Sequence, residues 1–340
     1  MIPSPVPHPH IRAHVRPRFA LLATMLMVAT GCDKARAFLQ AGQTAGPPHI
    51  PPGQELNLAN HPVIVFQVFG ETGDARMVPF AAIVGGKLTQ IQLNPDNWLR
   101  FDAQYLRKGK TYTIYQDGRA DGTAEVRQGM WERNGQTLYS LPGCRTLTPI
   151  AAVRANATRL RNDFTVELLA SNGTLGVPRA AQPMAPAEIA RVARAVAAQV
   201  AQNSGIKPAM LDSLDFHAVA FPSGATKANT IVASFIDPSA ENASSTSART
   251  THLLLVIDRD SANTWRATFT HRINGPLEAA AFRRYIDHLD LTGDGVDEII
   301  LESWQFGRDT YLTVLGWNNG KWTEVYRARS NWCLDERPKS

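Results

Sequence analysis

The runs EIILESW (298–304), TYLTVLGW (310–317) and KWTEVYR (321–327) follow one another closely near the end of the chain. β-Branched and aromatic residues are frequent in each run, and the apolar residues recur with a period close to two, which is typical of β-strands. The short polar segments between the runs have the lengths of hairpin connections. These three runs therefore predict an antiparallel sheet.

Five more runs of the same kind precede them: DFHAVAF (215–221), NTIVASFI (229–236), HLLLVID (252–258), TWRATFTH (264–271) and RRYIDHL (283–289). The small, polar stretch 238–250 between two of them is expected to be a loop. Eight strands at hairpin spacing predict a continuous antiparallel β-meander domain over residues 210–330.

A second β-rich region lies nearer the N-terminus, where strands are expected at 62–70, 75–93, 110–116 and 122–128. Gly85-Gly86 and Asp117-Gly118 interrupt these runs, and such pairs are frequent in hairpin turns. The region predicts a small antiparallel β domain over residues 61–146. Pro79 cannot donate a ladder hydrogen bond, so it indicates an edge strand or a bulge within the second run.

One helix is expected in the segment 147–209, which otherwise reads as a linker. In PAEIARVARAVAAQVAQ (186–202), Ile189, Val192, Val196 and Val200 recur at spacings of three and four, and Pro186 suits a first helical turn. The predicted fold class is therefore mainly β with one or two helices, the larger domain resembling propeller blades.

The N-terminus combines a positive segment, residues 1–18 with Arg12, Arg16 and Arg18, and an uncharged apolar run, FALLATMLMVA (19–29). The run is shorter than the roughly twenty residues that a membrane-spanning helix needs, but it suits a signal peptide, predicted here as residues 1–31. The following VATGC (28–32) resembles a bacterial lipobox, which implies lipidation of Cys32. An ordinary secretory signal or an uncleaved anchor are the alternatives.

Lipidation at Cys32 would anchor the chain to a bacterial membrane, facing the periplasm or the exterior, because acyl chains bury many methylene groups. Residues 32–60 are rich in Gly and Pro and are expected to form a flexible tether. The membrane is thus the first predicted partner, through the lipid anchor, and the predicted location is the cell envelope.

Charge argues against nucleic acid as a partner. The chain has 35 Lys and Arg against 30 Asp and Glu, and three arginines but no acidic residue lie in residues 1–31. Removal of that segment leaves 32 basic against 30 acidic residues, with no basic block. A nearly neutral chain lacks the electrostatic footprint of a nucleic-acid-binding protein.

Two cysteines remain once Cys32 is lipidated, Cys144 and Cys333. In an oxidising compartment two such thiols are candidates for a disulfide, and two unrelated buried thiols are the alternative. The sequence does not fix their separation.

One segment, DLTGDGVDE (290–298), has the pattern of a metal-binding loop. Oxygen-bearing side chains occupy its positions 1, 3, 5 and 9, Gly295 allows a sharp turn at position 6, and the Val296 carbonyl offers a further oxygen. Calcium is the cation that suits such a set. The EF-hand alternative fails because position 12 is Leu301 and strands, not helices, are expected on both sides.

This loop, followed by a strand, resembles the calcium loop of FG-GAP (integrin-type) propeller repeats over about forty residues, from Tyr285 to Tyr326. The resemblance implies a structural calcium ion held by the side chains of Asp290, Thr292, Asp294 and Glu298 and by the backbone of Val296. Thr292 replaces the commoner Asp or Asn, and the loop occurs once, whereas a propeller has several blades. An acidic turn without metal is the alternative.

The familiar motifs of hydrolases, zinc proteases, phosphate loops and dinucleotide sites are absent from the sequence. His288 with Asp287 and Asp290 is the one local cluster suited to acid–base chemistry, but a structural role at the strand end and in the loop beside the calcium site is the preferred interpretation. Trp304, Trp317, Trp322 and Trp332 offer a platform for a glycan or a peptide, or alternatively belong to the core.

The leading expectation is a lipid-anchored, calcium-stabilised binding or structural module with a protein or glycan ligand. The rival is a periplasmic hydrolase whose active site is assembled from distant residues. A concave pocket with converging carboxylates or histidine would favour the enzyme, whereas a flat apolar patch would favour the binder. An accessory subunit of an envelope complex is the third alternative.

Overall fold

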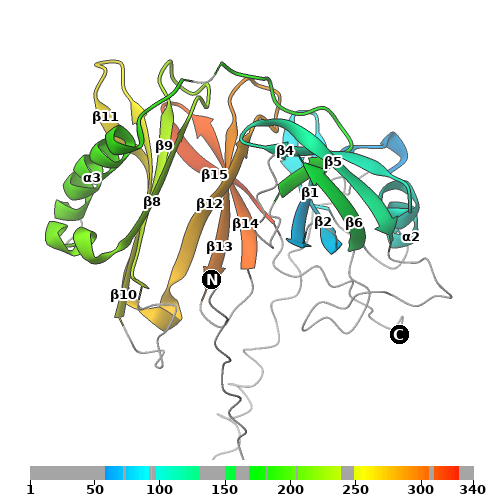
Figure 1. The fold of residues 1–340 in the computed structure, drawn as a ribbon, viewed down its shortest axis with the longest axis horizontal. Helices are drawn as coiled ribbons and strands as arrows, with labels where there is room; N and C mark the ends of the chain where they lie inside the picture. The colour runs from blue at the N-terminus through cyan, green and yellow to red at the C-terminus, as the bar shows by residue number, and fades with distance from the viewer. Residues whose placement is uncertain are drawn as a thin grey trace, which may run out of the picture. The chain divides into compact units, whose positions relative to one another are not determined.

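The computed structural model describes residues 58–71, 74–91, 93, 97–129, 150–157, 168–180, 182–203, 206–238, 249–305 and 310–328, all within one compact unit. Most of this part of the chain is β-strand, and α3 (Pro186–Gln202) is its one long helix (Figure 1). The prediction of a mainly β fold is confirmed. The predicted signal, Cys32, Cys144 and Cys333 lie outside the described residues, as does most of the predicted tether.

The first half of the described chain forms an antiparallel barrel. Its sheet has the order β1-β7-β4-β5-β6-β2-β3, and the additional pairing of β1 with β2 closes six strands into a ring, with β3 attached to β2 outside it. The strands are β1 (Val63–Glu71), β2 (Asp74–Val84), β3 (Lys87–Thr89), β4 (Thr111–Gln116), β5 (Arg119–Gln128), β6 (Ala151–Ala157) and β7 (Leu168–Ser171).

Along the barrel strands, side chains point alternately into the barrel and away from it, and the inward side chains form its core. Ile64, Phe66 and Val68 of β1 are buried in the barrel core, whereas Val65 belongs to a different cluster on the outside. The short helix α2 (Trp98–Phe101) and the π-helical turn η2 (Asp102–Leu106) add buried side chains to the same core. A single-turn 3₁₀ helix, η1 (Leu58–Asn60), precedes the barrel.

Pro79 lies at a β-bulge, one of the two alternatives that the sequence left open. Val65 pairs with Ala81 and Phe66 pairs with Pro79, so Phe80 is the extra residue of β2. The bulge directs Phe80 to the second half of the protein, where its ring lies 5.4 Å from that of Tyr326 and its carbonyl accepts a 2.8 Å bond from the Tyr326 hydroxyl. Burial of a side chain of this size contributes roughly 2–3 kcal/mol.

The barrel extends beyond residue 146, the boundary expected from the sequence. β6 bridges β5 and β2, and β7 bridges β1 and β4, so both strands complete the ring. β6 reads AAVRANA, which is rich in alanine and poor in β-branched residues, so its sequence gives little strand signal.

The eight C-terminal strands form two antiparallel sheets rather than one continuous meander. The first has the order β11-β10-β9-β8 and the second the order β12-β13-β14-β15. Their bounds are β8 (Asp215–Phe221), β9 (Thr230–Ile236), β10 (Arg249–Arg259), β11 (Trp265–Pro276), β12 (Ala281–Leu289), β13 (Glu298–Gln305), β14 (Thr310–Asn318) and β15 (Lys321–Arg327). The break falls between β11 and β12, where the 3₁₀ turn η5 (Leu277–Ala279) intervenes.

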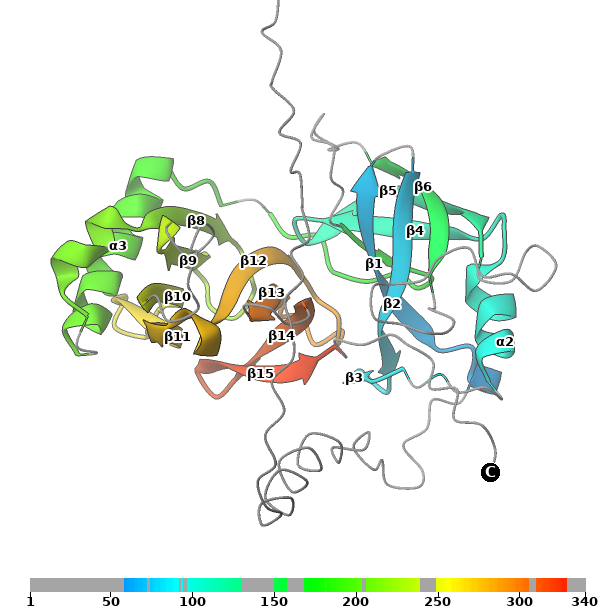
Figure 2. The same cartoon turned by 90° about the horizontal axis from the view of Figure 1, so that it is seen from below.

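Helix α3 covers the face of the β8–β11 sheet that points away from β12–β15 (Figures 1 and 2). Val192 and Val196 are buried on the predicted face together with Ala193, Ala197 and Ala201, and the 3₁₀ helix η3 (Pro208–Ser213) follows. Within the described residues, no helix is long and apolar enough to cross a membrane.

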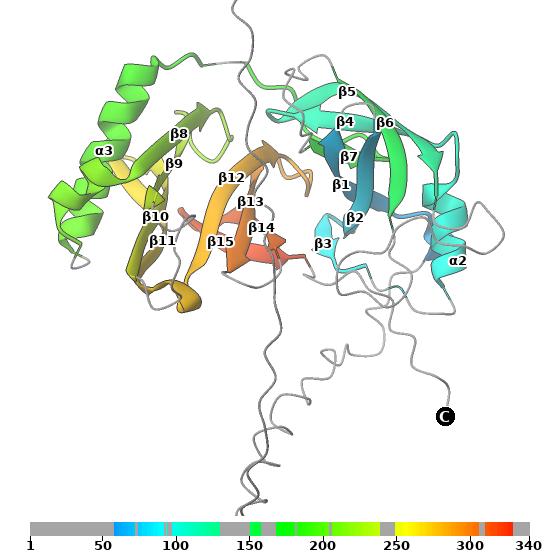
Figure 3. The same cartoon turned by 60° about the horizontal axis from the view of Figure 1, so that its bottom comes forward.

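Figure 3 shows α3, the β8–β11 sheet, the β12–β15 sheet and the barrel following one another, and a buried cluster lies between each neighbouring pair of layers. One lies between α3 and the β8–β11 sheet, the next between the two four-stranded sheets, and the third between the β12–β15 sheet and the outside of the barrel. A polar contact also joins the two four-stranded sheets. Nε1 of Trp322 on β15 donates to the buried carboxylate of Asp258 on β10 at 2.8 Å.

Candidate ligand pocket beside His288

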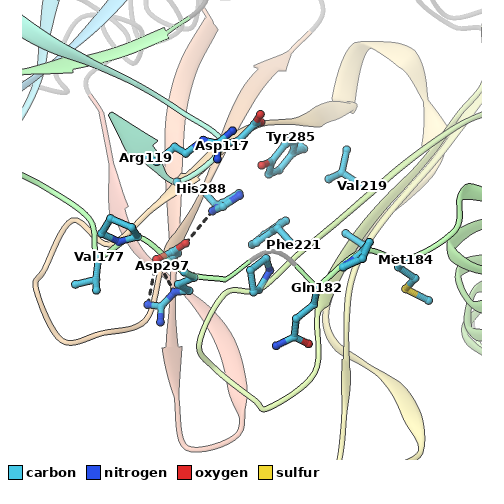
Figure 4. A pocket seen from close by; sticks show the side chains of 16 residues that line it. Asp117, Arg119, Val177, Gln182, Met184, Val219, Phe221, Tyr285, His288 and Asp297 are labelled. Atoms are coloured by element: carbon cyan, nitrogen blue, oxygen red, sulfur yellow. Dashed lines mark hydrogen bonds and ion pairs between the residues drawn. The ribbon is translucent and has the colours of Figure 1, made fainter. Parts of the chain in front are cut away.

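A cavity of about 550 Å³ opens where the barrel meets the two sheets. Its walls come from the β4–β5 hairpin (117–119), the connection between β7 and α3 (177–184), the end of β8 (219–222), β12 and Asp297. Figure 4 shows these side chains around the opening. The size falls within the usual range of small-molecule sites, which is about 300–1,000 Å³.

His288 and Asp297 form a buried hydrogen-bonded pair in this pocket. Nδ1 of His288 lies 2.8 Å from Oδ2 of Asp297, and the two side chains are 6% and 3% exposed. Because the carboxylate accepts, Nδ1 carries the proton and Nε2 has a free lone pair when the imidazole is neutral. Among the described residues Nε2 has no hydrogen-bond partner, and in Figure 4 it points away from Asp297 toward Tyr285.

Arg179 fixes the other oxygen of Asp297. Its Nε and Nη2 lie 3.3 and 3.2 Å from Oδ1, and Nη2 also donates to the carbonyl of Gly295. The backbone N–H of Asp297 donates to the Ser223 carbonyl at 2.8 Å. Asp297 is therefore held by three segments of the chain, and its charge is balanced by a guanidinium.

Aromatic rings surround the imidazole. The ring of Phe221 stacks on His288 with a centroid distance of 3.8 Å and an interplanar angle of 5°, and it lies 5.8 Å from the ring of Tyr285. Tyr285 is partly exposed, and in the described part of the chain its hydroxyl has no hydrogen-bond partner. Burial, with the nearby charges of Asp287, Asp117 and Asp297, raises the pKa of Tyr285 well above its usual value, so the hydroxyl keeps its proton.

The tip of the β4–β5 hairpin closes over the pair. Gly118 has a φ of +72°, and a Cβ at this position would lie 2.5 Å from Cε1 of His288. The buried carboxyl of Asp287 anchors the hairpin, since its Oδ1 accepts bonds from the backbone N–H of Asp117 at 2.9 Å and of His288 at 2.7 Å. Burial raises the pKa of Asp287 to about 8.

The loop 290–298 connects β12 to β13, so strands flank it as expected. Gly293 N and Gly295 N donate to the two carboxylate oxygens of Asp290 at 2.7 and 3.0 Å, and Val296 N donates to Asp294 at 2.8 Å. Glu298 accepts from Leu291 N at 2.7 Å and from the Thr292 hydroxyl at 2.9 Å. Asp297, the next-to-last residue of this loop, is the carboxylate that holds His288.

These oxygens have the hard chemistry that calcium prefers. In the described residues, however, no three His, Cys, Asp or Glu side chains are arranged as a metal ion would require. The carboxylates of Asp290 and Glu298 are occupied by hydrogen bonds within the loop. Burial, together with the charges of Asp294 and Asp290, raises the pKa of Glu298 to about 7. Calcium at this loop stays a prediction.

The tryptophans divide between the core and a second cavity. Trp322 is buried, and Trp304 stacks on Phe282 with centroids 5.5 Å apart. Trp317 lines a cavity of about 430 Å³ together with Thr292, Asp294 and Glu298. Trp332 lies outside the described residues, so the four do not form a platform in this part of the chain.

The sequence singled out His288 but paired it with its neighbours Asp287 and Asp290. In the structure its side chain contacts Asp297, while Asp287 holds the hairpin and Asp290 folds its own loop. Arg179, Phe221 and Tyr285 were not predicted. No local signal marks them, because they come from three segments that meet only in the folded chain.

Comparisons with models of known families, with curated proteins and with solved structures give no match to this chain.

Proposed function

We propose that this chain is a lipid-anchored envelope protein whose folded part is a binding module, with its ligand site in the pocket beside His288. The observation that carries the proposal is the buried Asp297, which holds Nδ1 of His288, while Nε2 and the Tyr285 hydroxyl face the cavity and have no partners among the described residues. Small-molecule sites commonly combine an apolar wall with a few fixed polar groups.

The walls of the pocket fit this description. Val177, Met184, Val219 and Phe221 supply apolar surface, and the buried pair of His288 and Asp297 is held by Arg179 and by the Ser223 carbonyl. Lipidation of Cys32 places such a module at a membrane surface. A concave pocket that holds a histidine and a carboxylate is also the feature expected of an enzyme, so hydrolysis is the second candidate below. For a binding module, a pocket rather than a flat patch moves the expected ligand from a protein or glycan surface toward a small molecule.

A blocked pocket tests the proposal. The full chain, purified in detergent and carrying ¹³C-methyl methionine, is screened by NMR against a mixed set of small fragments. Met184 lines the pocket and Met77 lies in the barrel core, so ligands of the pocket should shift the Met184 methyl signal and leave Met77 unchanged.

Val177→Phe provides the blocking variant, because Val177 is 54% exposed and a larger ring there fills the opening without disturbing a core. Val84→Phe is the matched control, since Val84 is 49% exposed on β2 and does not line the pocket. Fragment shifts should vanish in the first variant and persist in the second. Equal shifts in both would contradict a site in this pocket.

The calcium ion at Asp290, Thr292, Asp294, Val296 and Glu298 is part of the proposed function as a structural element. Support comes from the oxygen chemistry of the loop and from its close carboxylates.

For the fold, we propose that each of the two four-stranded sheets corresponds to a propeller blade, since a blade is an antiparallel sheet of four strands.

Hydrolysis is the second candidate function, and the His288–Asp297 hydrogen bond favours it, because a carboxylate on Nδ1 orients an imidazole as a general base. Among the described residues, no serine, threonine or cysteine lines the pocket, so such a base would act on water. Turnover of ester, amide or glycoside substrates that is lost in His288→Gln would favour the enzyme, and binding without turnover would favour the binding module.

A further inference from the structure

We infer that the ligand of the His288 pocket is an uncharged molecule with an apolar body and a hydroxyl group that binds between His288 Nε2 and the Tyr285 hydroxyl. The inference rests on the proposed function, because it names the ligand class of the same site. It is argued from the charges, the polar groups and the walls of the cavity.

The charges of the pocket cancel. The carboxylate of Asp297 meets the guanidinium of Arg179 at 3.2 Å, so the described residues present no uncompensated carboxylate or guanidinium in the buried part of the pocket. At the rim, Asp117 and Arg119 carry opposite charges and lie two residues apart on the hairpin. A charged ligand would lose its hydration without gaining an opposite partner, which is costly. The site therefore favours an uncharged ligand.

The exposed rim carries the polar side chains of Asp117, Arg119 and Gln182. Further in, Nε2 of His288 and the Tyr285 hydroxyl have no partner among the described residues, and they are complementary. Because Nδ1–H of His288 donates to Asp297, Nε2 is the ring nitrogen left to pair with the ligand. The Tyr285 hydroxyl is a donor throughout the ordinary pH range. Figure 4 shows the oxygen end of Tyr285 directed toward the imidazole of His288. A hydroxyl group donates one hydrogen bond and accepts others, so one ligand hydroxyl satisfies both groups.

Apart from the exposed Gln182 side chain, whose Nε2 donates to the Lys227 carbonyl at 3.4 Å, the walls beside α3 and β8 are apolar. Met184, Val219 and Phe221 line the inner side, and the exposed Val177 lines the opening. An apolar body gains about 25 cal/mol for each Å² that it buries against such walls. A strongly polar ligand with many hydroxyls would lose most of its hydrogen bonds to water, so a single hydroxyl on a hydrocarbon body is the better match.

Matched probes test the inference on the full chain, purified in detergent and carrying ¹³C-methyl methionine. 4-Methylphenol presents a hydroxyl on an apolar ring, and 4-methylanisole has the same ring with the hydroxyl proton replaced by a methyl group. 4-Methylbenzoate and 4-methylbenzylammonium supply the charged counterparts. The Met184 methyl shift is titrated at equal free probe concentration, with Met77 as the internal control.

The phenol should bind about ten-fold more tightly than the ether, since loss of one hydrogen bond and an unsatisfied acceptor cost about that factor. Tyr285→Phe should reduce the affinity for the phenol several-fold. Tyr311→Phe, on β14 and outside the pocket, should leave that affinity unchanged.

Equal affinities for phenol and ether would overturn the hydroxyl class while leaving the proposed binding function intact. Tighter binding of the benzoate or the ammonium probe would overturn the uncharged class. If no probe shifts Met184 and the mixed fragment set also leaves it unchanged, the proposed function fails together with the inference. If other fragments shift Met184 but none of the four probes does, the inference alone fails.

Discussion

The carboxyl group of Asp287 joins the barrel to the β12–β15 sheet through hydrogen bonds from the backbone of residues 117 and 288. It is 4% exposed, and burial raises its pKa to about 8. The folded state therefore binds a proton that the unfolded chain, with its ordinary aspartate, releases above pH 4. This residue makes the stability of the protein depend on pH.

The contribution of Asp287 to stability should be complete below pH 4 and should be lost as the pH rises through about 8. Asp287→Asn keeps an acceptor oxygen but cannot ionise. Relative to the variant, the native chain should lose on the order of a few kcal/mol of unfolding free energy between pH 5 and pH 9, measured by denaturant unfolding. Parallel pH profiles for the two chains would contradict this.

Gly118 packs directly against His288 and so helps to shape the pocket. Asp117-Gly118 could be predicted as a hairpin turn from the sequence alone. The contact of Gly118 with His288 could not be predicted, because 170 positions separate the two residues in the chain. The turn thus has a local role that a sequence pattern indicates and a tertiary role that only packing produces.

Gly118→Ala should destabilise the protein and displace His288, since its Cβ would lie 2.5 Å from Cε1 of the imidazole. Gly109→Ala is the matched control: Gly109 has a φ of +84° and nothing within 4 Å of the added Cβ. Both variants carry the backbone cost of about 1–2 kcal/mol. A larger loss of thermal stability and a shifted His288 imidazole NMR signal are expected only for Gly118→Ala, and equal effects would contradict the close contact.

At the scale of elements, the pattern of the chain predicted α3 and the eight C-terminal strands closely. α3 occupies the predicted residues 186–202, and β8 the predicted 215–221. The division into two sheets was not predictable, because β9 and β10 are buried on both faces and give no alternation that would assign a face to a partner. The ring closure of the barrel depends on long-range pairing that no local pattern contains.

Calcium binding by the loop 290–298 is the most specific prediction made for any single element. Three carboxylates, those of Asp290, Asp294 and Glu298, share one short turn, and a bound cation would offset their mutual repulsion. Calcium added to metal-stripped protein should raise the melting temperature, with a gain of about 2.7 kcal/mol at a hundredfold excess over the dissociation constant.

Asp294→Asn should reduce this calcium response, and magnesium should give a smaller one. Asp212→Asn is the control, because the Asp212 side chain is 83% exposed and pairs with Arg194 away from the loop. An unchanged melting temperature in calcium for the native chain would rule out a structural ion at this loop.

At the scale of the whole molecule, the pocket depends on the order of the layers. The barrel contributes its hairpin tip, the two sheets contribute β8 and β12, and the connection before α3 contributes Arg179. Sequence analysis could find the individual strands and the acidic loop, but the cavity forms from segments between residues 117 and 297. The residues that line it could therefore be identified only from the packing of the layers.

Anchoring of the whole molecule is a separate prediction from the VATGC segment (28–32). In a bacterial host, Cys32→Ser should remove the acyl mass from the mature N-terminus and shift the protein from the membrane fraction to the soluble fraction, measured by mass spectrometry and fractionation. Cys144→Ser should leave both properties unchanged. Retention of Cys32→Ser in the membrane without acylation would contradict a lipid anchor.

We propose that the pocket beside His288 binds a small molecule. The most direct measurement is an experimental structure of the full chain with the tightest-binding fragment from the screen. We expect the fragment to lie between Tyr285 and His288, within hydrogen-bond distance of Nε2 and in contact with Phe221 or Met184. A fragment bound elsewhere, with the His288 pocket filled by the protein's own side chains, would contradict it.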